Sequence, residues 1–163
     1  YDPNERNFAR DLLDVPQKPL LFSIGRLDKD SSGLLLFTND GELTQKLSHP
    51  SHEVEKEYLV SASRPIARED LEAMRRGVYL PDNRLAYRIH RFEILGSRWT
   101  RVILTEGKNR EIRKLLEHFD YRVLDLIRVR VGPVELGELK TGHWRRLTSD
   151  EVRRLHDEKG QKR

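Results

Sequence analysis

The chain has 163 residues, of which 36% are hydrophobic and 36% are charged, and this length favours a single domain with a sizeable core. It contains no cysteine, which excludes disulfides, a thiolate nucleophile and the usual structural zinc sites. No apolar run approaches the roughly 18 residues of a membrane span, and the polar start lacks a secretory signal. We therefore expect a cytoplasmic protein without a membrane partner. The net charge of +4 fits a polyanionic partner or simply a basic, solvated surface.

The first half of the chain predicts short elements. Apolar runs at residues 20–24 and 34–37 predict strands, the second of them buried, because neither run is long enough for a helix. Leucines four residues apart predict a short amphipathic helix over residues 42–48. Residues 58–62 combine β-branched and aromatic side chains and predict a further strand.

The second half continues the alternation of helices and strands. Residues 68–76 predict a helix, and residues 81–83 predict a turn. Further strands are predicted over 86–95, 100–105 and 121–131, and further helices over 110–119 and 149–157. We expect Ser149 to cap the last helix, with Val152 and Leu155 facing the core. The sum is an α+β domain with a mixed or mostly antiparallel sheet flanked by short helices.

The segment from Ile24 to Gly41 carries the clearest functional signal. It places Asp28 in a short polar loop between two apolar runs, with Arg26 two residues earlier. Functional groups are typically held on loops by a rigid scaffold, although an isolated loop aspartate is usually a solvated surface residue. Asp28 and Asp30 could also suggest a metal site, but no further acid or histidine joins them at ligand spacing. We therefore expect no metal.

Several blocks along the chain resemble one enzyme family. They are Gly25-Arg26-Leu27-Asp28, Ser31-Ser32-Gly33-Leu34-Leu35, Thr38-Asn39-Asp40-Gly41, Lys56-Glu57-Tyr58-Leu59-Val60, Glu106-Gly107-Lys108-Asn109-Arg110-Glu111-Ile112-Arg113, Leu126-Ile127-Arg128-Val129-Arg130-Val131-Gly132 and Leu139-Lys140-Thr141-Gly142-His143-Trp144-Arg145. Together they resemble the pseudouridine synthases, specifically the ribosomal RNA branch that includes RsuA and RluB. One block would be weak evidence, but several in order over residues 19–148 are specific.

The resemblance implies the pseudouridine synthase fold and the isomerisation of uridine to pseudouridine without a cofactor. It assigns Asp28 as nucleophile, Tyr58 as the ring that packs on the extruded uracil, and Arg113 as the cation that pairs with Asp28. It also implies that Arg26, Lys56, Lys108, Arg110, Ile112, Arg128 and Arg130 bind the substrate. Taken singly, Tyr58 also reads as a packed strand aromatic, Ile112 as plain core, and the basic residues as a solvated face.

The resemblance also predicts the organisation and the partner. Residues 1–148 would form the catalytic domain, lacking its N-terminal strand and any S4-type domain, and residues 149–163 a C-terminal helix and tail. The expected protein is a monomer that acts on ribosomal RNA or an assembly intermediate. The first choice of target is large-subunit (23S) RNA, and the alternative is small-subunit (16S) RNA.

Two other functions remain open from the sequence. One is an RNA-binding module that kept the fold and lost catalysis. The other is a nuclease or glycosidase-like enzyme, which would need a second carboxylate as acid or base.

Overall fold

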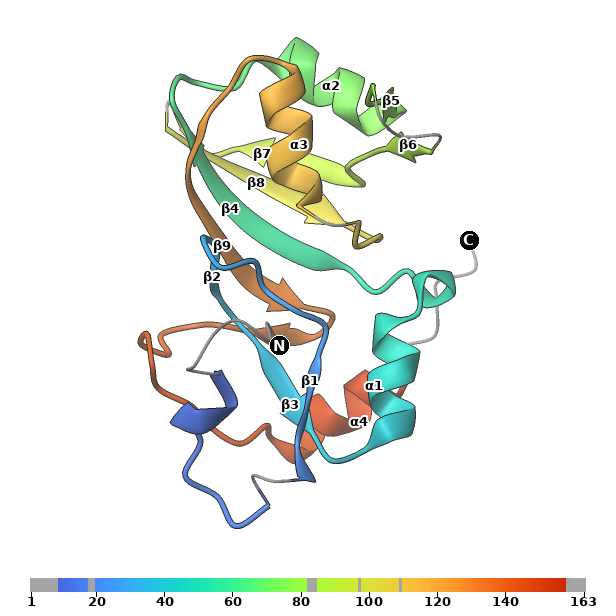
Figure 1. Ribbon diagram of the computed structural model, residues 1–163, viewed down its shortest axis with the longest axis vertical. Helices are drawn as coiled ribbons and strands as arrows, with labels where there is room; N and C mark the ends of the chain where they lie inside the picture. The colour runs from blue at the N-terminus through green and yellow to red at the C-terminus, as the bar shows by residue number, and fades with distance from the viewer. Residues whose placement is uncertain (1–8, 18–19, 82–84, 97, 109, 158–163) are drawn as a thin grey trace.

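The computed structural model describes residues 9–17, 20–81, 85–96, 98–108 and 110–157. Two long antiparallel strands, β4 (Lys56–Ala62) and β9 (Val123–Val131), lie side by side along an elongated molecule (Figure 1). In the described residues they form a six-stranded sheet with β7 (Arg91–Ile94), β8 (Trp99–Leu104), β10 (Val134–Glu135) and β2 (Ser32–Gly33). Its order is β10-β9-β4-β8-β7, and β2 pairs with β9 as a parallel strand.

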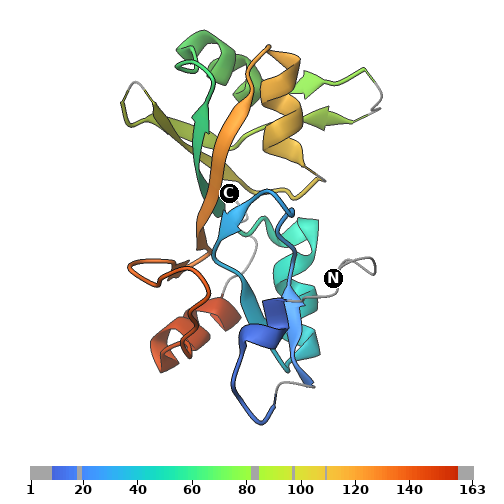
Figure 2. The same ribbon diagram turned by 60° about the vertical axis from the view of Figure 1, so that its left-hand side comes forward.

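The upper part of the molecule packs two helices against the sheet. Helix α2 (Arg68–Arg76) and helix α3 (Glu111–His118) lie beside the hairpin of β5 (Val78–Tyr79) and β6 (Ala86–Tyr87), as Figures 1 and 2 show. Apolar residues recur on one face of each helix and meet the sheet in a first core. This core includes Val60, Leu71, Met74, Val102, Ile112, Leu115, Leu116 and Leu126.

A second core lies in the lower part. The antiparallel pair β1 (Phe22–Ile24) and β3 (Leu36–Thr38) packs there with α1 (Gly41–Ser48) and α4 (Ser149–Asp157). The short helical turns η1 (Ala9–Leu12) and η3 (Pro50–His52) complete the described elements. The second core includes Ile24, Leu34, Leu36, Leu43, Leu47, Val131, Val134 and Leu155.

The Thr38–Gly41 block has a structural role in this part. The Asp40 carboxylate accepts a hydrogen bond from the Leu43 backbone N–H at 3.1 Å, which caps α1. The Thr38 hydroxyl in turn accepts from the Asp40 backbone N–H at 3.0 Å. These contacts explain why polar residues separate the two apolar segments β3 and α1.

The α+β class and the main elements agree with the sequence predictions, and α2 has the predicted bounds. The single strand predicted over residues 86–95 is wrong, because the Ile89 N–H donates to the Met74 carbonyl at 3.1 Å and interrupts the strand between β6 and β7. Residues 34–37 are also not one buried strand, since β3 begins at Leu36. The turn predicted at residues 81–83 falls largely outside the described residues.

The expected cap of α4 is wrong as well. Thr148, not Ser149, accepts from the Glu151 N–H at 3.1 Å, and the Glu151 carboxylate accepts from the Thr148 N–H at 2.8 Å. This reciprocal pair is a capping box. Leu155 is buried as predicted, whereas Val152 is 40% exposed. No helix in the described ranges has the length and apolar character needed to cross a membrane.

Candidate active site

Asp28 lies in the loop between β1 and β2, at the junction of the two cores. Its carbonyl accepts from the Ser31 N–H at 2.9 Å, which closes a tight turn. The side chain is half-buried, and no hydrogen bond from the described residues is made to its carboxylate. Figures 1 and 2 both show this loop reaching the lower end of α3. The loop therefore places beside one end of α3 a carboxylate that accepts no hydrogen bond from the described residues.

Two arginines hold the loop: Arg113 of α3, and Arg110, which directly precedes that helix. Arg110 binds both carboxylate oxygens of Asp30, at 3.0 and 3.1 Å. Arg113 donates to the Asp30 carbonyl at 2.7 Å and to the Ser31 hydroxyl at 3.3 Å. The hydrogen bond from Arg110 lowers the pKa of Asp30 to about 2, so this carboxylate is ionised at neutral pH.

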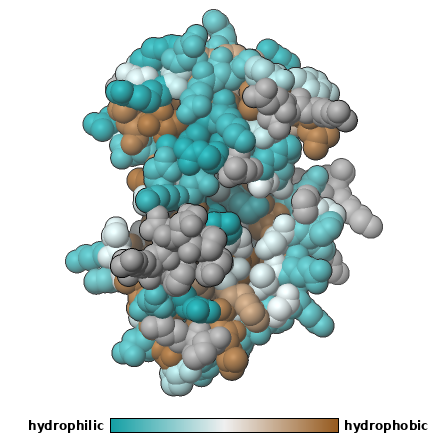
Figure 3. Space-filling model, in the orientation of Figure 1, coloured by the Kyte–Doolittle hydropathy of each residue, from teal (hydrophilic) through white to brown (hydrophobic). Residues whose placement is uncertain are grey.

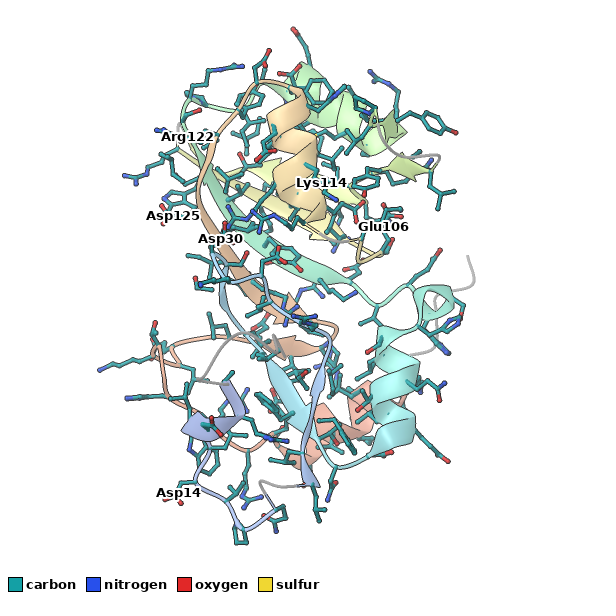
Figure 4. The ribbon with its side chains drawn as sticks, in the orientation of Figure 1. Asp14, Asp30, Glu106, Lys114, Arg122 and Asp125 are labelled. Atoms are coloured by element: carbon teal, nitrogen blue, oxygen red, sulfur yellow. The ribbon has the colours of Figure 1, made fainter. Side chains whose placement is uncertain are left out.

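These contacts correct one prediction. Arg113 does not pair with the Asp28 carboxylate, because the turn directs the backbone and carboxylate of Asp30, rather than Asp28, toward the helix. Arg110 forms a bidentate pair with Asp30, and its side chain is 38% exposed, so its contact with RNA stays a prediction. Figure 4 shows Asp30 and Glu106 on opposite sides of the lower end of α3.

Arg128 holds the same loop from the sheet. Its side chain is buried, with 3% of the residue exposed. Its Nε donates to the Leu34 carbonyl at 2.8 Å, and its Nη1 lies 3.4 Å from the Arg26 carbonyl as a second donor. The predicted contact between Arg128 and the RNA backbone is therefore wrong, because the guanidinium is enclosed by the protein.

Arg130 lies on the opposite face of the sheet from Arg128. It contacts Glu55 at 2.9 Å and Glu57 at 3.2 Å. Those carboxylates also pair with Arg91 and Arg101, respectively. Arg130 is thus part of an alternating ion-pair network on the other face of the sheet from Arg128, and its role in RNA binding stays a prediction.

Lys56 and Tyr58 share the face of β4 that looks toward the site. In the sheet register Tyr58 is paired with Val102 on one side and with Arg128 on the other. Its half-buried ring packs against the first core. Burial lowers the pKa of Lys56, and the positive charge of Arg128 lowers it further. The two side chains therefore lie near the residue that anchors the Asp28 loop.

Ile112 and Lys108 make contacts within the protein that were not predicted from the sequence. Ile112 is a core residue that is 5% exposed and lines a small apolar void with Leu71 and Met74, so it is not the wall of an open base slot. The Lys108 ammonium contacts the Glu106 carboxylate at 2.6 Å and stands 5.4 Å from the centre of the Tyr87 ring. The contact of Lys108 with a phosphate stays a prediction.

A pair of carboxyl groups beside the site was not predicted from the sequence. Glu111 is 3% exposed, and its oxygens accept from the N–H groups of Lys108 and Arg88 at 3.2 and 3.3 Å. Glu106 accepts from the same Arg88 N–H at 3.1 Å. Burial and a hydrogen bond with Glu106 raise the pKa of Glu111 to about 8. Burial opposes ionisation of Glu106 too, but hydrogen bonds from Glu111 and Lys108 leave its pKa lowered.

We expect Glu111→Gln to stabilise the protein at alkaline pH. The folded protein keeps a proton on Glu111 that the unfolded chain releases near its ordinary pKa of 4.5, so this stability is present below about pH 4.5 and lost as the pH rises through about 8. Glutamine imitates the protonated acid and removes that loss. Each unit of pKa difference is worth about 1.4 kcal/mol, so the gain in unfolding free energy at pH 9 is expected to exceed about 1 kcal/mol. Thermal unfolding of both proteins at pH 5, 7 and 9 measures this gain. If the stability of the two proteins changed with pH in the same way, Glu111 would not keep its proton in the folded state.

The structure thus brings together part of the predicted set of site residues. Six of them lie on one loop or beside it: Arg26, Asp28, Lys56, Tyr58, Arg113 and Arg128. Figure 3 shows a hollow at the waist of the molecule, between its upper part and α1. Within the described ranges, no cluster of three or more histidine or acidic side chains is placed to hold a metal ion.

Comparison with known proteins defines the family. The chain belongs to the RNA pseudouridylate synthases, whose family model matches residues 2–118. A solved structure described as a pseudouridylate synthase has a TM-score of 0.85 and 30% identity, and the match covers 90% of this chain and 64% of that one. This likeness confirms the predicted fold.

Two curated relatives have the same name, ribosomal large subunit pseudouridine synthase B. The protein from Yersinia pestis is 42% identical over 151 residues, which are 90% of this chain and 47% of that protein. The protein from Escherichia coli (strain K12) is 41% identical over 151 residues, covering 90% of this chain and 51% of that protein. The chain spans about half the length of these relatives.

Proposed function

We propose that this protein isomerises a uridine of large-subunit ribosomal RNA to pseudouridine, with Asp28 as the catalytic nucleophile. The family membership and the names of the relatives support the reaction and its substrate class. The assignment of Asp28 rests on one observation. Its carboxylate accepts no hydrogen bond from the described residues, and its loop is held from two directions by the buried arginine side chains Arg113 and Arg128.

The proposed reaction exchanges one bond of C1′ for another. The N1–C1′ bond breaks, the uracil turns, and a C5–C1′ bond forms, while C5 loses its proton and N1 gains one. A carboxylate nucleophile must be ionised when it attacks. The two arginines hold the loop on which this carboxylate lies.

We assign the surrounding side chains to the substrate. Tyr58 would pack against the extruded uracil, since base–aromatic stacking is favourable and tolerant of sequence. Arg26 is exposed on the same loop and would contact the RNA backbone or fill the space the base leaves. Extruding a base costs a few kcal/mol, and phosphate contacts offset part of this cost without reading sequence.

The proposed catalytic domain is the segment 1–148, followed by a C-terminal helix and tail over 149–163. Helix α4 of that final segment buries Leu155 in the second core, beside β1 and α1. In this proposal the catalytic unit acts as a monomer on ribosomal RNA or on an assembly intermediate.

Tritium release from RNA labelled at C5 of uridine tests the reaction. We expect tritium to be released from large-subunit RNA, because C5 must lose its hydrogen in the isomerisation. Binding alone and hydrolysis do not break that bond. RNA retention without tritium release would instead indicate a binding module, and strand or base cleavage would indicate a hydrolase.

Mapping the modified uridine tests the choice of substrate. Carbodiimide adducts of pseudouridine stop reverse transcription, so a strain lacking this enzyme should lose one stop in large-subunit RNA. Loss of a stop only in small-subunit RNA would overturn the proposed substrate and leave the chemistry standing. The absence of any change in either RNA would remove ribosomal RNA as the target.

A further inference from the structure

Arg128 contacts both ends of the loop that carries Asp28. At the start of the loop its Nη1 lies 3.4 Å from the Arg26 carbonyl, and at the end its Nε donates to the Leu34 carbonyl at 2.8 Å. Its own carbonyl accepts from the Leu34 N–H at 2.8 Å. A single residue of β9 therefore contacts the chain on both sides of Asp28, after β1 and after β2.

The environment of Arg128 is unusual for a residue needed only to stabilise the fold. The side chain is almost fully buried, yet no carboxylate in the described part of the chain pairs with it, and its Nη2 has no hydrogen-bond partner there. Burying an unpaired cation is costly. Two backbone carbonyls offset only part of this cost, so the arrangement is disfavoured by stability alone.

The same residue borders the other site groups. Tyr58 is its partner in the sheet register, and its charge lowers the pKa of Lys56. The planar guanidinium has donors fixed in a fork, so it can hold two carbonyls at a set separation. A lysine ammonium lacks that fixed geometry.

We propose that Arg128 is a positioning residue, which sets the distance between Asp28 and the uridine by fixing both ends of the Asp28 loop. It acts through the loop backbone and makes no contact with the substrate. The consequence for the reaction rate rests on the proposed function, whereas the consequence for the loop does not. A displacement of about 1 Å in a reacting group can cost roughly 100-fold in rate.

The variant Arg128→Lys separates positioning from folding. We expect the single-turnover rate of tritium release at saturating RNA to fall by about 10- to 100-fold, with the RNA concentration for half-saturation changed by less than about threefold. Backbone hydrogen exchange should become faster in residues 26–34 and stay unchanged in β4 and β8. Arg101→Lys is the matched control, since Arg101 lies in the same sheet and pairs with Glu57 on the opposite face.

The outcomes distinguish the two proposals. If the folded Arg128→Lys protein keeps its rate within about threefold, or if exchange of residues 26–34 does not change, Arg128 does not position the loop. If the unmodified protein releases no tritium, the proposed function fails, and the exchange measurement still decides the contact. Should Arg128→Lys not fold, Arg128→Met removes the buried charge as well as the fork, and the same two measurements apply to it.

Discussion

Asp28→Asn is expected to lower the rate of uridine isomerisation by roughly 1,000-fold or more, because removing a nucleophile eliminates most of an enzyme's rate enhancement. Asparagine keeps the shape of aspartate but has no nucleophilic anion. Since no described residue donates a hydrogen bond to the Asp28 carboxylate, the substitution should leave the loop and the stability of the fold unchanged. Tritium release in single turnover measures the rate, and filter binding measures the affinity for RNA, which should change little.

Asp30→Asn is the informative control for this result. It keeps the nucleophile but weakens the bidentate contact with Arg110 and the ion pair with Arg113. We expect a partial loss of rate, because the loop remains held by the Asp30 carbonyl and by Arg128. Activity of Asp28→Asn within tenfold of the unmodified protein would reject Asp28 as nucleophile.

The opposite roles of Arg128 and Arg130 show why the sequence could not predict the whole site. Residues two apart in a strand normally share a face, so the Arg128-Val129-Arg130 pattern suggested two equivalent basic side chains. The register shifts between Glu57 and Tyr58, where Glu57 pairs with Arg130 and Tyr58 with Arg128. Such a bulge reverses the alternation and sends Arg130 to the opposite face.

The contacts that α3 makes with the loop could not be predicted from the sequence either. The motif correctly brought the segment around Arg113 to the Asp28 loop, although the two lie more than 80 residues apart, as the separation of 83 between Arg113 and Asp30 shows. It could not decide which loop residue faces the helix, because this depends on the turn closed by the Asp28 carbonyl and the Ser31 N–H. The fold was more predictable, since apolar spacing reports burial directly.

The sharpest structural test of the loop is Gly33→Ala, which we expect to destabilise the protein by about 2–4 kcal/mol. A Cβ at Gly33 would lie 2.2 Å from the Arg128 carbonyl oxygen and 2.7 Å from its nitrogen, and both are backbone atoms of a central strand. The φ angle of +108° is also one that alanine rarely adopts. Either β2 leaves β9 or the backbone of Arg128 moves, and both changes release the end of the Asp28 loop.

Thermal unfolding measures this loss, with Gly41→Ala as the control. For a chain of this size about 1 kcal/mol corresponds to 2–4 °C, so Tm should fall by roughly 4–16 °C for Gly33→Ala. Gly41 begins α1, and a Cβ there meets nothing within 4 Å, so its substitution should leave Tm unchanged or raise it slightly. Equal Tm values for the two variants would contradict the close contact between β2 and β9. A lower Tm for Gly33→Ala, with isomerisation reduced even where the variant is fully folded, would tie this contact to the position of Asp28.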